Sequence, residues 1–488
     1  MLRIKSQTNA IILFLVLLCI FILSFMPTNA QYVAAPAAMC IIIVVTLWMK
    51  LRDRDNAIPF FDVGIFCALV TTLYTVYPLL NYWANGFSFG SDFNDNRLQY
   101  ISPKELGEFH LRHVLYLFSF VISYLLFRRK EVTKTRHIVA PNKYSRKVIL
   151  FYFIALTSYF YFLQHFTGLN YNATYSNIDS YNANLSLFSS LPLVLIQISG
   201  KLWGILFLFK LAVLLIVVSR CRQHKWLAVL FVWIAVEIIH TLIIKGARTG
   251  LIWFLLAAAL YYHRIIKPLS LKFLLVSGII LLTTFILMGH YRSFSDTTTF
   301  SKYLADNISF VFSSNNEFQV LLGTAYDVLR LKTAGVHFPS YLYINDIIAL
   351  LPPQQLLPFE KIPASEWYLR QIGLSKTGLG LMWGVISQSI IGFDWFELAF
   401  RGVILGYILA KIHQWYLKHQ SGFFETLIYV YFCCTIYYTF RSTTLSFLVD
   451  IVWIIIPFYI LLRLGIAIIS PKRANFARFS SFTNFDNK

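Results

Sequence analysis

The feature that most constrains this chain is a series of continuous apolar runs that begins near the N-terminus and ends near residue 465. An α-helix of about 20 apolar residues crosses roughly 30 Å of hydrocarbon, so each run is long enough to span a membrane. Closed β-barrels need short alternating strands instead. Hydrophobic residues make up 58% of the chain and charged residues 13%, which excludes a water-soluble globule. We predict an all-α polytopic membrane protein.

About twelve transmembrane helices are predicted, with short loops between most of them. The first nine lie within residues 1–290 and the last three within 395–465. A large outer loop, 291–394, is expected between helices 9 and 10, and a basic tail at 466–488. A helix at about 301–332 and an interfacial stretch from His337 to Pro363 are expected within that loop. The predicted spans are 10–27, 32–50, 59–80, 109–127, 148–165, 196–218, 226–244, 249–263, 272–290, 395–412, 422–440 and 446–465.

The positions of the basic residues predict the orientation of the chain. They gather before the first span and after every second one, for example at Lys50, Arg52 and Arg128. Because Lys and Arg are retained in cytoplasmic loops, these loops and both termini are predicted to be cytoplasmic. The net charge of +20 therefore reflects orientation and contact with anionic lipid, and not binding of nucleic acid.

Three arginines stand in predicted outer turns, where positive residues are disfavoured. Arg248 lies in the Gly-flanked turn 246–250, Arg292 follows the ninth span, and Arg441 lies between the last two spans. A guanidinium presents a rigid fork of donors that matches phosphate oxygens and keeps its proton. Snorkelling to lipid headgroups is the alternative. We favour a clamp for a lipid pyrophosphate.

Charged side chains inside predicted spans are costly unless they are paired or face a wet cavity. Lys210, Glu237, His240, Arg401 and Asp450 are in this position and predict a polar interior. Glu237 and His240 share a helix face, which suits a metal ligand pair or proton relay, although a hydrogen-bonded packing pair is the preferred interpretation. The sequence has no HExxH, CxxC, Walker or dinucleotide motif, so no metal or cofactor is predicted.

Four short motifs carry a resemblance to a known family over the second half of the chain. They are Gly-Ala-Arg-Thr-Gly at 246–250, Tyr-Arg-Ser at 291–293, the Pro-rich run 351–361 that leads into 377–380 and Gly392, and Phe-Arg-Ser at 440–442. With the large late loop, this order resembles the O-antigen polymerase family, also called Wzy or oligosaccharide repeat unit polymerases. One departure is Gln388, where many relatives are expected to have an acidic residue.

The resemblance implies a GT-C-like, metal-independent glycosyltransferase in the bacterial inner membrane. It would join two polyprenyl-pyrophosphate-linked glycans on the periplasmic face with inversion, in partnership with a chain-length regulator. Arg248, Arg292 and Arg441 would stabilise the leaving pyrophosphate. Glu317 and His337, in the large loop with Asp327, would orient or deprotonate the acceptor.

Three other functions stay open at this point. An O-antigen ligase shares the span count and the late loop. A transporter or flippase of the same lipid-linked sugar is expected to show inverted repeats, and none is detected in the sequence. A scaffold would leave the outer arginines unexplained.

Overall fold

The computed structural model describes most of the helical part of the chain. The described residues are 2–55, 61–89, 98, 100–128, 141–167, 193–221, 223–243, 248–270, 272–273, 276–279, 317–348, 350–351, 362, 364–372 and 383–469. Within these ranges the chain is helical and contains no strand. The prediction of an all-α protein is therefore confirmed for the described part.

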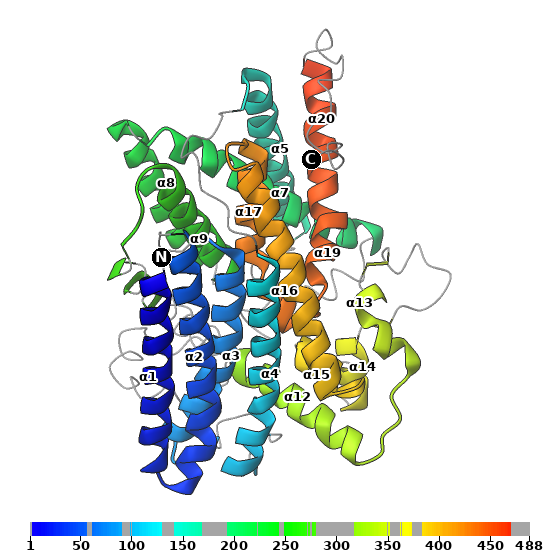
Figure 1. The fold of residues 1–488 in the computed structure, drawn as a ribbon. Helices are drawn as coiled ribbons and strands as arrows, with labels where there is room; N and C mark the ends of the chain where they lie inside the picture. The colour runs from blue at the N-terminus through cyan, green and yellow to red at the C-terminus, as the bar shows by residue number, and fades with distance from the viewer. Residues whose placement is uncertain are drawn as a thin grey trace, which may run out of the picture.

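Mostly long helices form a bundle, and a group of mostly short helices lies against one end of it (Figure 1). The long helices are α1 (Leu2–Ser24), α2 (Thr28–Asp55), α3 (Val63–Ala84), α4 (Pro103–Phe127), α5 (Lys143–Thr167), α7 (Leu193–Ser219), α8 (His224–Ile243), α9 (Arg248–Ile265), α16 (Trp395–Lys418), α17 (Phe423–Thr435) and α20 (Ile456–Ile469). The short ones are α12 (Glu317–Thr333), η3 (Ser340–Ile344), α13 (Asn345–Ile348), α14 (Ala364–Gln371) and α15 (Gly384–Ile391). Between α17 and α20 the chain forms α18 (Tyr438–Arg441), α19 (Ser446–Asp450) and the π-helical turn η5 (Ile451–Ile455).

The predicted spans agree with the helices, apart from 272–290, which lies almost wholly outside the described residues. Among the described residues, five helices are both long and apolar enough to cross a membrane. They are Thr28–Arg52, Val63–Ala84, Pro103–Phe127, Lys201–Ser219 and Ser446–Ile469. The chain is therefore a multi-pass membrane protein, while the total of twelve spans stays a prediction. The expected helix at 301–332 is α12 from Glu317 onward, and its first part lies outside the described residues.

The tightest contact in the bundle is between α4 and α16, where small residues let the two backbones touch. A Cβ atom on Gly402 would lie 2.6 Å from the Tyr116 carbonyl oxygen, and one on Gly406 would lie 2.4 Å from that of Phe120. Ser123 Oγ donates to the Val403 carbonyl at 2.7 Å across the same contact. Lipid gives apolar helices no net hydrophobic drive to associate, so such spacing of small residues supplies the close packing that holds them together.

Gly406→Leu is expected to separate α4 from α16, because its side chain would meet backbone atoms that cannot rotate away. Overpacking of this kind costs at least about 1–3 kcal/mol. Thermal unfolding of the detergent-purified protein should show a lower midpoint and a smaller folded fraction on size exclusion. The matched control is Val403→Leu, at an exposed position of the same helix. Equal unfolding midpoints for the two variants would contradict the close-packing account.

Opposite ends of this helix pair carry buried ion pairs. At one end, which we call the basic end, Asp62 caps α3 and lies 3.2 Å from Arg128 at the end of α4 and 3.5 Å from His413 of α16. Tyr124 donates to the Asp62 carboxylate at 2.7 Å. This cluster ties α3, α4 and α16 together.

At the other end, which we call the loop end, Arg112 of α4 holds the turn that precedes α16. Its Nε and Nη2 atoms donate to the two Asp394 carboxylate oxygens at 2.8 and 2.7 Å. The guanidinium also lies over the Trp395 ring, 4.6 Å from its centroid. Asp394 has a positive φ of 49°, which is uncommon for a residue other than glycine. The short helices α12–α15 lie at this end (Figure 1).

Candidate active site

The segment from Thr435 to Leu445 reverses the chain at the loop end and gathers aromatic and charged groups around one corner. Arg441 ends α18 and is half-buried. Its Nη1 donates to the Tyr437 hydroxyl at 3.5 Å, and its guanidinium carbon lies 5.7 and 5.9 Å from the centroids of the Tyr437 and Tyr438 rings. Cation–π contacts of this kind fix the guanidinium in position.

The start of α9 lies at the same corner. Trp253 contacts the same two tyrosine rings, with centroids 5.8 Å from Tyr437 and 5.7 Å from Tyr438. Cys434 Sγ also donates to the Trp253 carbonyl at 3.5 Å. Arg248 begins this helix, five positions before Trp253. The positive dipole end of α9 therefore lies beside the corner that holds Arg441, and it favours an anion.

A second polar group is centred on Asp450, in α19, the helix that follows α18. Asp450 accepts hydrogen bonds from Tyr431 and Thr435 of α17 and interacts electrostatically with Lys201 of α7. Its charge is therefore matched by a cation from another helix, as is expected for an acid within a membrane span.

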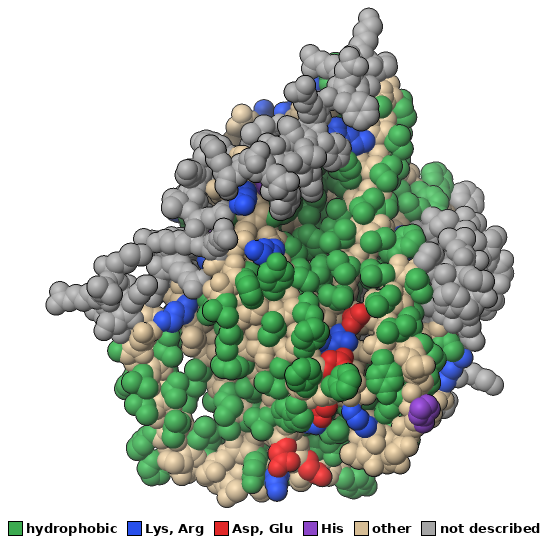
Figure 2. Space-filling model, turned by 45° about the vertical axis from the view of Figure 1, so that its right-hand side comes forward, with side chains coloured by type: hydrophobic (Ala, Val, Ile, Leu, Met, Phe, Trp, Pro, Cys, Tyr) green, Lys and Arg blue, Asp and Glu red, His purple; other side chains and the backbone are tan. Residues whose placement is uncertain are grey.

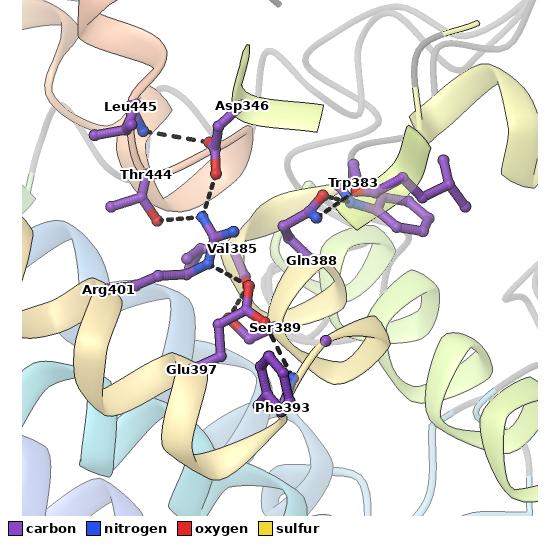
Figure 3. A network of polar contacts seen from close by, with 12 residues as sticks. Asp346, Trp383, Val385, Gln388, Ser389, Phe393, Glu397, Arg401, Thr444 and Leu445 are labelled. Carbon is purple, nitrogen blue, oxygen red and sulfur yellow. Dashed lines mark hydrogen bonds and ion pairs between the residues drawn. The ribbon is translucent and has the colours of Figure 1, made fainter. Parts of the chain in front are cut away.

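The most densely connected polar network at the loop end is centred on Arg401 (Figure 3). Its Nε donates to Glu397 Oε1 at 2.7 Å, and its Nη1 binds Asp346 Oδ2 and donates to Thr444 Oγ1 at 3.2 Å. The three charged side chains are only 10% to 16% exposed. This ion triad joins α13, α16 and the 441–445 turn.

The position of the Glu397 carboxylate requires a glycine at residue 392. Its Oε2 accepts from the Phe393 N–H at 3.1 Å, and a Cβ on Gly392 would lie 1.7 Å from the same oxygen. Any side chain at 392 would therefore displace the carboxylate. Lys332 of α12 donates to the Gly392 carbonyl at 2.9 Å and holds the turn from the other side.

Figure 2 shows a largely apolar face with a short column of acidic and basic side chains running through it. Large apolar side chains close to the triad in the chain are exposed: Ile347 by 58%, Phe393 by 80% and Phe396 by 75%. Exposed apolar surface on a membrane protein is suited to contact with lipid. The triad is therefore flanked by exposed apolar side chains that suit contact with lipid.

Comparison with known proteins decides the family. A model of the family described as O-antigen polysaccharide polymerase Wzy matches residues 10–473. The chain belongs to this Wzy family. Searches of curated proteins and of solved structures gave no significant match. The resemblance that the second half of the sequence indicated is confirmed, and the match extends it to the first half.

Of the three arginines predicted to form a clamp in this Wzy chain, the structure describes the side chain of Arg441. It describes the backbone of Arg248, whose side chain lies outside the described part, and Arg292 lies outside the described residues altogether. The corner therefore brings Arg441 together with the helix that Arg248 begins.

The acid and base candidates of the large loop are separated in this Wzy chain. Glu317 begins α12, and its side chain lies outside the described part. His337 follows the other end of that helix and is exposed. Asp327 Oδ2 accepts from the Tyr368 hydroxyl at 2.7 Å and so joins α12 to α14.

Two of the polar residues predicted inside the bundle, Lys210 and Glu237, are partners of each other. Lys210 pairs with Glu237 at 2.6 Å, and Trp233 also donates to Glu237 at 3.1 Å. The Lys210 ammonium lies 4.9 Å from the Phe254 ring centroid. His240, at the end of α8, is exposed. In the structure, Glu237 thus pairs with a lysine of α7, a partner that its spacing to His240 did not indicate.

Gln388, the departure from the expected Wzy pattern, has a clear structural role. Its Nε2 donates to the Leu342 carbonyl at 2.6 Å and its Oε1 accepts from Trp383 Nε1 at 2.9 Å. A carboxylate at this position would have no proton for the carbonyl. The amide therefore joins α15 to η3. Its partner in η3, Leu342, is four residues before Asp346 in the chain.

Proposed function

We propose that this Wzy-family chain lengthens O-antigen by inverting glycosyl transfer on the periplasmic face of the bacterial inner membrane. The donor is the growing chain on a polyprenyl pyrophosphate, and the acceptor is a new repeat unit on the same kind of carrier. The hydroxyl of the acceptor forms a bond to the anomeric carbon of the donor. The bond from that carbon to the carrier pyrophosphate breaks, and the electron pair leaves with the phosphate.

The observation that carries this proposal is the corner formed by Arg441, Tyr437, Tyr438 and the start of α9. A pyrophosphate leaving group gains negative charge in the transition state, and fixed cations in a water-poor site stabilise such charge well. Arg441 is fixed by two tyrosine rings, and the N-terminus of α9 adds its dipole. We assign Arg248 and Arg292 to the same clamp, and no step of this reaction calls for a metal or other cofactor.

The proposed arrangement in the membrane follows from charge. Residues 1–290 and 395–465 form the membrane part in a GT-C-like arrangement, 291–394 the periplasmic segment, and 466–488 a cytoplasmic tail. The basic end, with Arg128 and Arg264, is then cytoplasmic, which agrees with the retention of basic residues on that side. Glu317 and His337 stay candidates for contact with the acceptor, and a chain-length regulator is the proposed partner.

Deletion of the gene in its host tests the proposed function directly. The expected lipopolysaccharide carries a single repeat unit, because ligation continues without polymerisation. Electrophoresis of the extracted lipopolysaccharide gives the answer, and plasmid-borne wild-type protein should restore the ladder. Lipopolysaccharide with no repeat unit at all would contradict a polymerase. Repeat units accumulated on the periplasmic leaflet would then identify a ligase, and repeat units accumulated on the cytoplasmic leaflet a flippase.

A further inference from the structure

We propose that Asp346 binds the attacking hydroxyl of the acceptor sugar and accepts its proton. This inference rests on the proposed function and adds a catalytic residue in the periplasmic segment that the sequence did not indicate. The evidence is the ion triad with Arg401 and Glu397, its position relative to the Arg441 corner, and unsatisfied hydroxyl groups nearby.

The two carboxylates of the triad differ in the hydrogen bonds that they already make. Glu397 uses one oxygen for Arg401 and the other for the Phe393 N–H at 3.1 Å. Asp346 Oδ2 binds Arg401, whereas Oδ1 has only a long contact of 3.5 Å with the Leu445 N–H. Because a carboxylate oxygen offers two lone pairs, Asp346 Oδ1 retains capacity for a substrate hydroxyl.

The charge balance of the triad favours a role as a proton acceptor. Two carboxylates share one guanidinium, so the group carries a net charge of −1 in a poorly hydrated place. Such a group suits sugar hydroxyls, which donate hydrogen bonds, and repels a phosphate. Arg401 keeps the Asp346 side chain in place, since loss of either partner would leave a buried charge uncompensated.

Hydroxyl groups without partners lie close to the triad. The Tyr116 hydroxyl, which is fully buried and interacts electrostatically with Arg401 and Asp346, has no hydrogen-bond partner among the described residues. Ser446 Oγ, in the residue after Leu445, also has no hydrogen-bond partner among the described residues. Buried polar groups are nearly always satisfied in native proteins, and these hydroxyls retain hydrogen-bonding capacity for a polar partner.

The position of Asp346 relative to Arg441 suits an inverting reaction. Leu445, which contacts Asp346, follows Arg441 by four residues, so their Cα atoms are at most about 14 Å apart. Arg401 and Asp346 contact the end of this turn, and the two tyrosine rings contact its start. A sugar bound across the turn would therefore meet the base on one side and the pyrophosphate clamp on the other, as inversion requires.

The proposed step couples bond formation at the anomeric carbon to proton transfer to Asp346. The acceptor oxygen forms a bond to the donor anomeric carbon while its proton passes to Asp346 Oδ1. The bond between that carbon and the pyrophosphate oxygen breaks, and its electron pair leaves with the phosphate. The proton then passes from Asp346 to water when the lengthened product moves away.

The surface in front of the triad gives the acceptor a route from the bilayer. Tyr343, Ile344 and Ile347 flank Asp346 in the chain and are exposed, and Phe393 and Phe396 are exposed beside Glu397. A polyprenyl tail can lie against an apolar face while its sugar reaches charged side chains that run through that face (Figure 2).

Azide distinguishes a base from a residue that only supports the fold. This anion attacks the anomeric carbon without losing a proton, so it needs no base. In purified Asp346→Ala supplied with lipid-linked repeat units, polymerisation should fall by about 10²–10⁴-fold. Added sodium azide should then release the carrier pyrophosphate and form a glycosyl azide of inverted configuration. Asp346→Asn, which keeps the side-chain volume, should behave in the same way.

Glu366→Gln is the matched control, since Glu366 is a second carboxylate of the same segment that is paired with an arginine, Arg370, at 2.6 Å. It should polymerise at about the wild-type rate and form no azide product. Polymerisation by Asp346→Asn within about threefold of wild type would overturn the proposal, and so would absence of the glycosyl azide from both Asp346 variants. Failure of the wild-type protein to lengthen the repeat units would instead refute the proposed function.

Discussion

Arg441→Ala is expected to leave lipopolysaccharide with a single repeat unit, even when the variant accumulates at the wild-type level. The guanidinium is held by two tyrosine rings at the corner where the pyrophosphate is proposed to bind. Removal of one fixed donor from a site that stabilises developing charge lowers rates by about 10²–10³-fold. The measurement is the ladder from a deletion strain that carries the variant, with turnover of purified protein as the quantitative readout.

The chain offers a matched control for this substitution. Arg463 in α20 contacts Tyr459, four positions before it, through a 2.7 Å hydrogen bond and a ring contact of 5.0 Å. The same spacing joins Arg441 to Tyr437. Arg463→Ala should keep the full ladder, and Arg441→Lys should restore only part of it, because an ammonium lacks the fork of donors. A normal ladder from Arg441→Ala would remove the clamp from the proposed function.

Arg401→Met is expected to destabilise the whole loop end. The variant leaves the carboxylates of Asp346 and Glu397 largely buried without their cation, and loss of one partner from a buried ion pair typically costs about 3–5 kcal/mol. In detergent, the unfolding midpoint should fall, and limited proteolysis should cut residues 317–391 faster than in the wild type. Cleavage elsewhere in the chain should change little.

A compensated variant separates this structural effect from the chemistry. The triple variant Arg401→Met, Asp346→Asn, Glu397→Gln removes all three charges, so most of the lost stability should return. Polymerisation should not return, because the proposed base is also gone. A triple variant as unstable as Arg401→Met would show that the charge balance of the triad is not what holds the loop end together.

The membrane helices were predictable from the sequence because hydropathy is a local property of the chain. Each run of apolar residues determines its own helix, whatever its neighbours, since no water is present to satisfy a broken backbone. The ends differ by several residues, as at α4, which begins at Pro103 where the predicted span begins at 109. There the capping box of Ser102 and Glu105 starts the helix before the apolar run does.

The contacts within the site were not predictable in the same way. Arg401 was identified as a charge in need of a partner, and Glu397, one turn earlier on the same helix, is at a spacing that helix geometry allows. Asp346 is 55 positions away in the chain and reaches Arg401 only after α13 has folded against α16. Pairing of Glu237 with Lys210 likewise depends on how α7 packs against α8. Tertiary contacts between distant residues leave no periodic signal in a single sequence.

The contact between α4 and α16 has a mechanical consequence. Their backbones touch at Gly402 and Gly406, and ion pairs close both ends of the pair, at Asp62 near one and Asp394 near the other. Two helices joined at their middle and at both ends can bend or slide past each other very little. The proposed function requires a lipid-linked chain to bind, advance by one repeat unit and leave in every cycle. We therefore expect the movement that this needs to occur outside the α4–α16 pair.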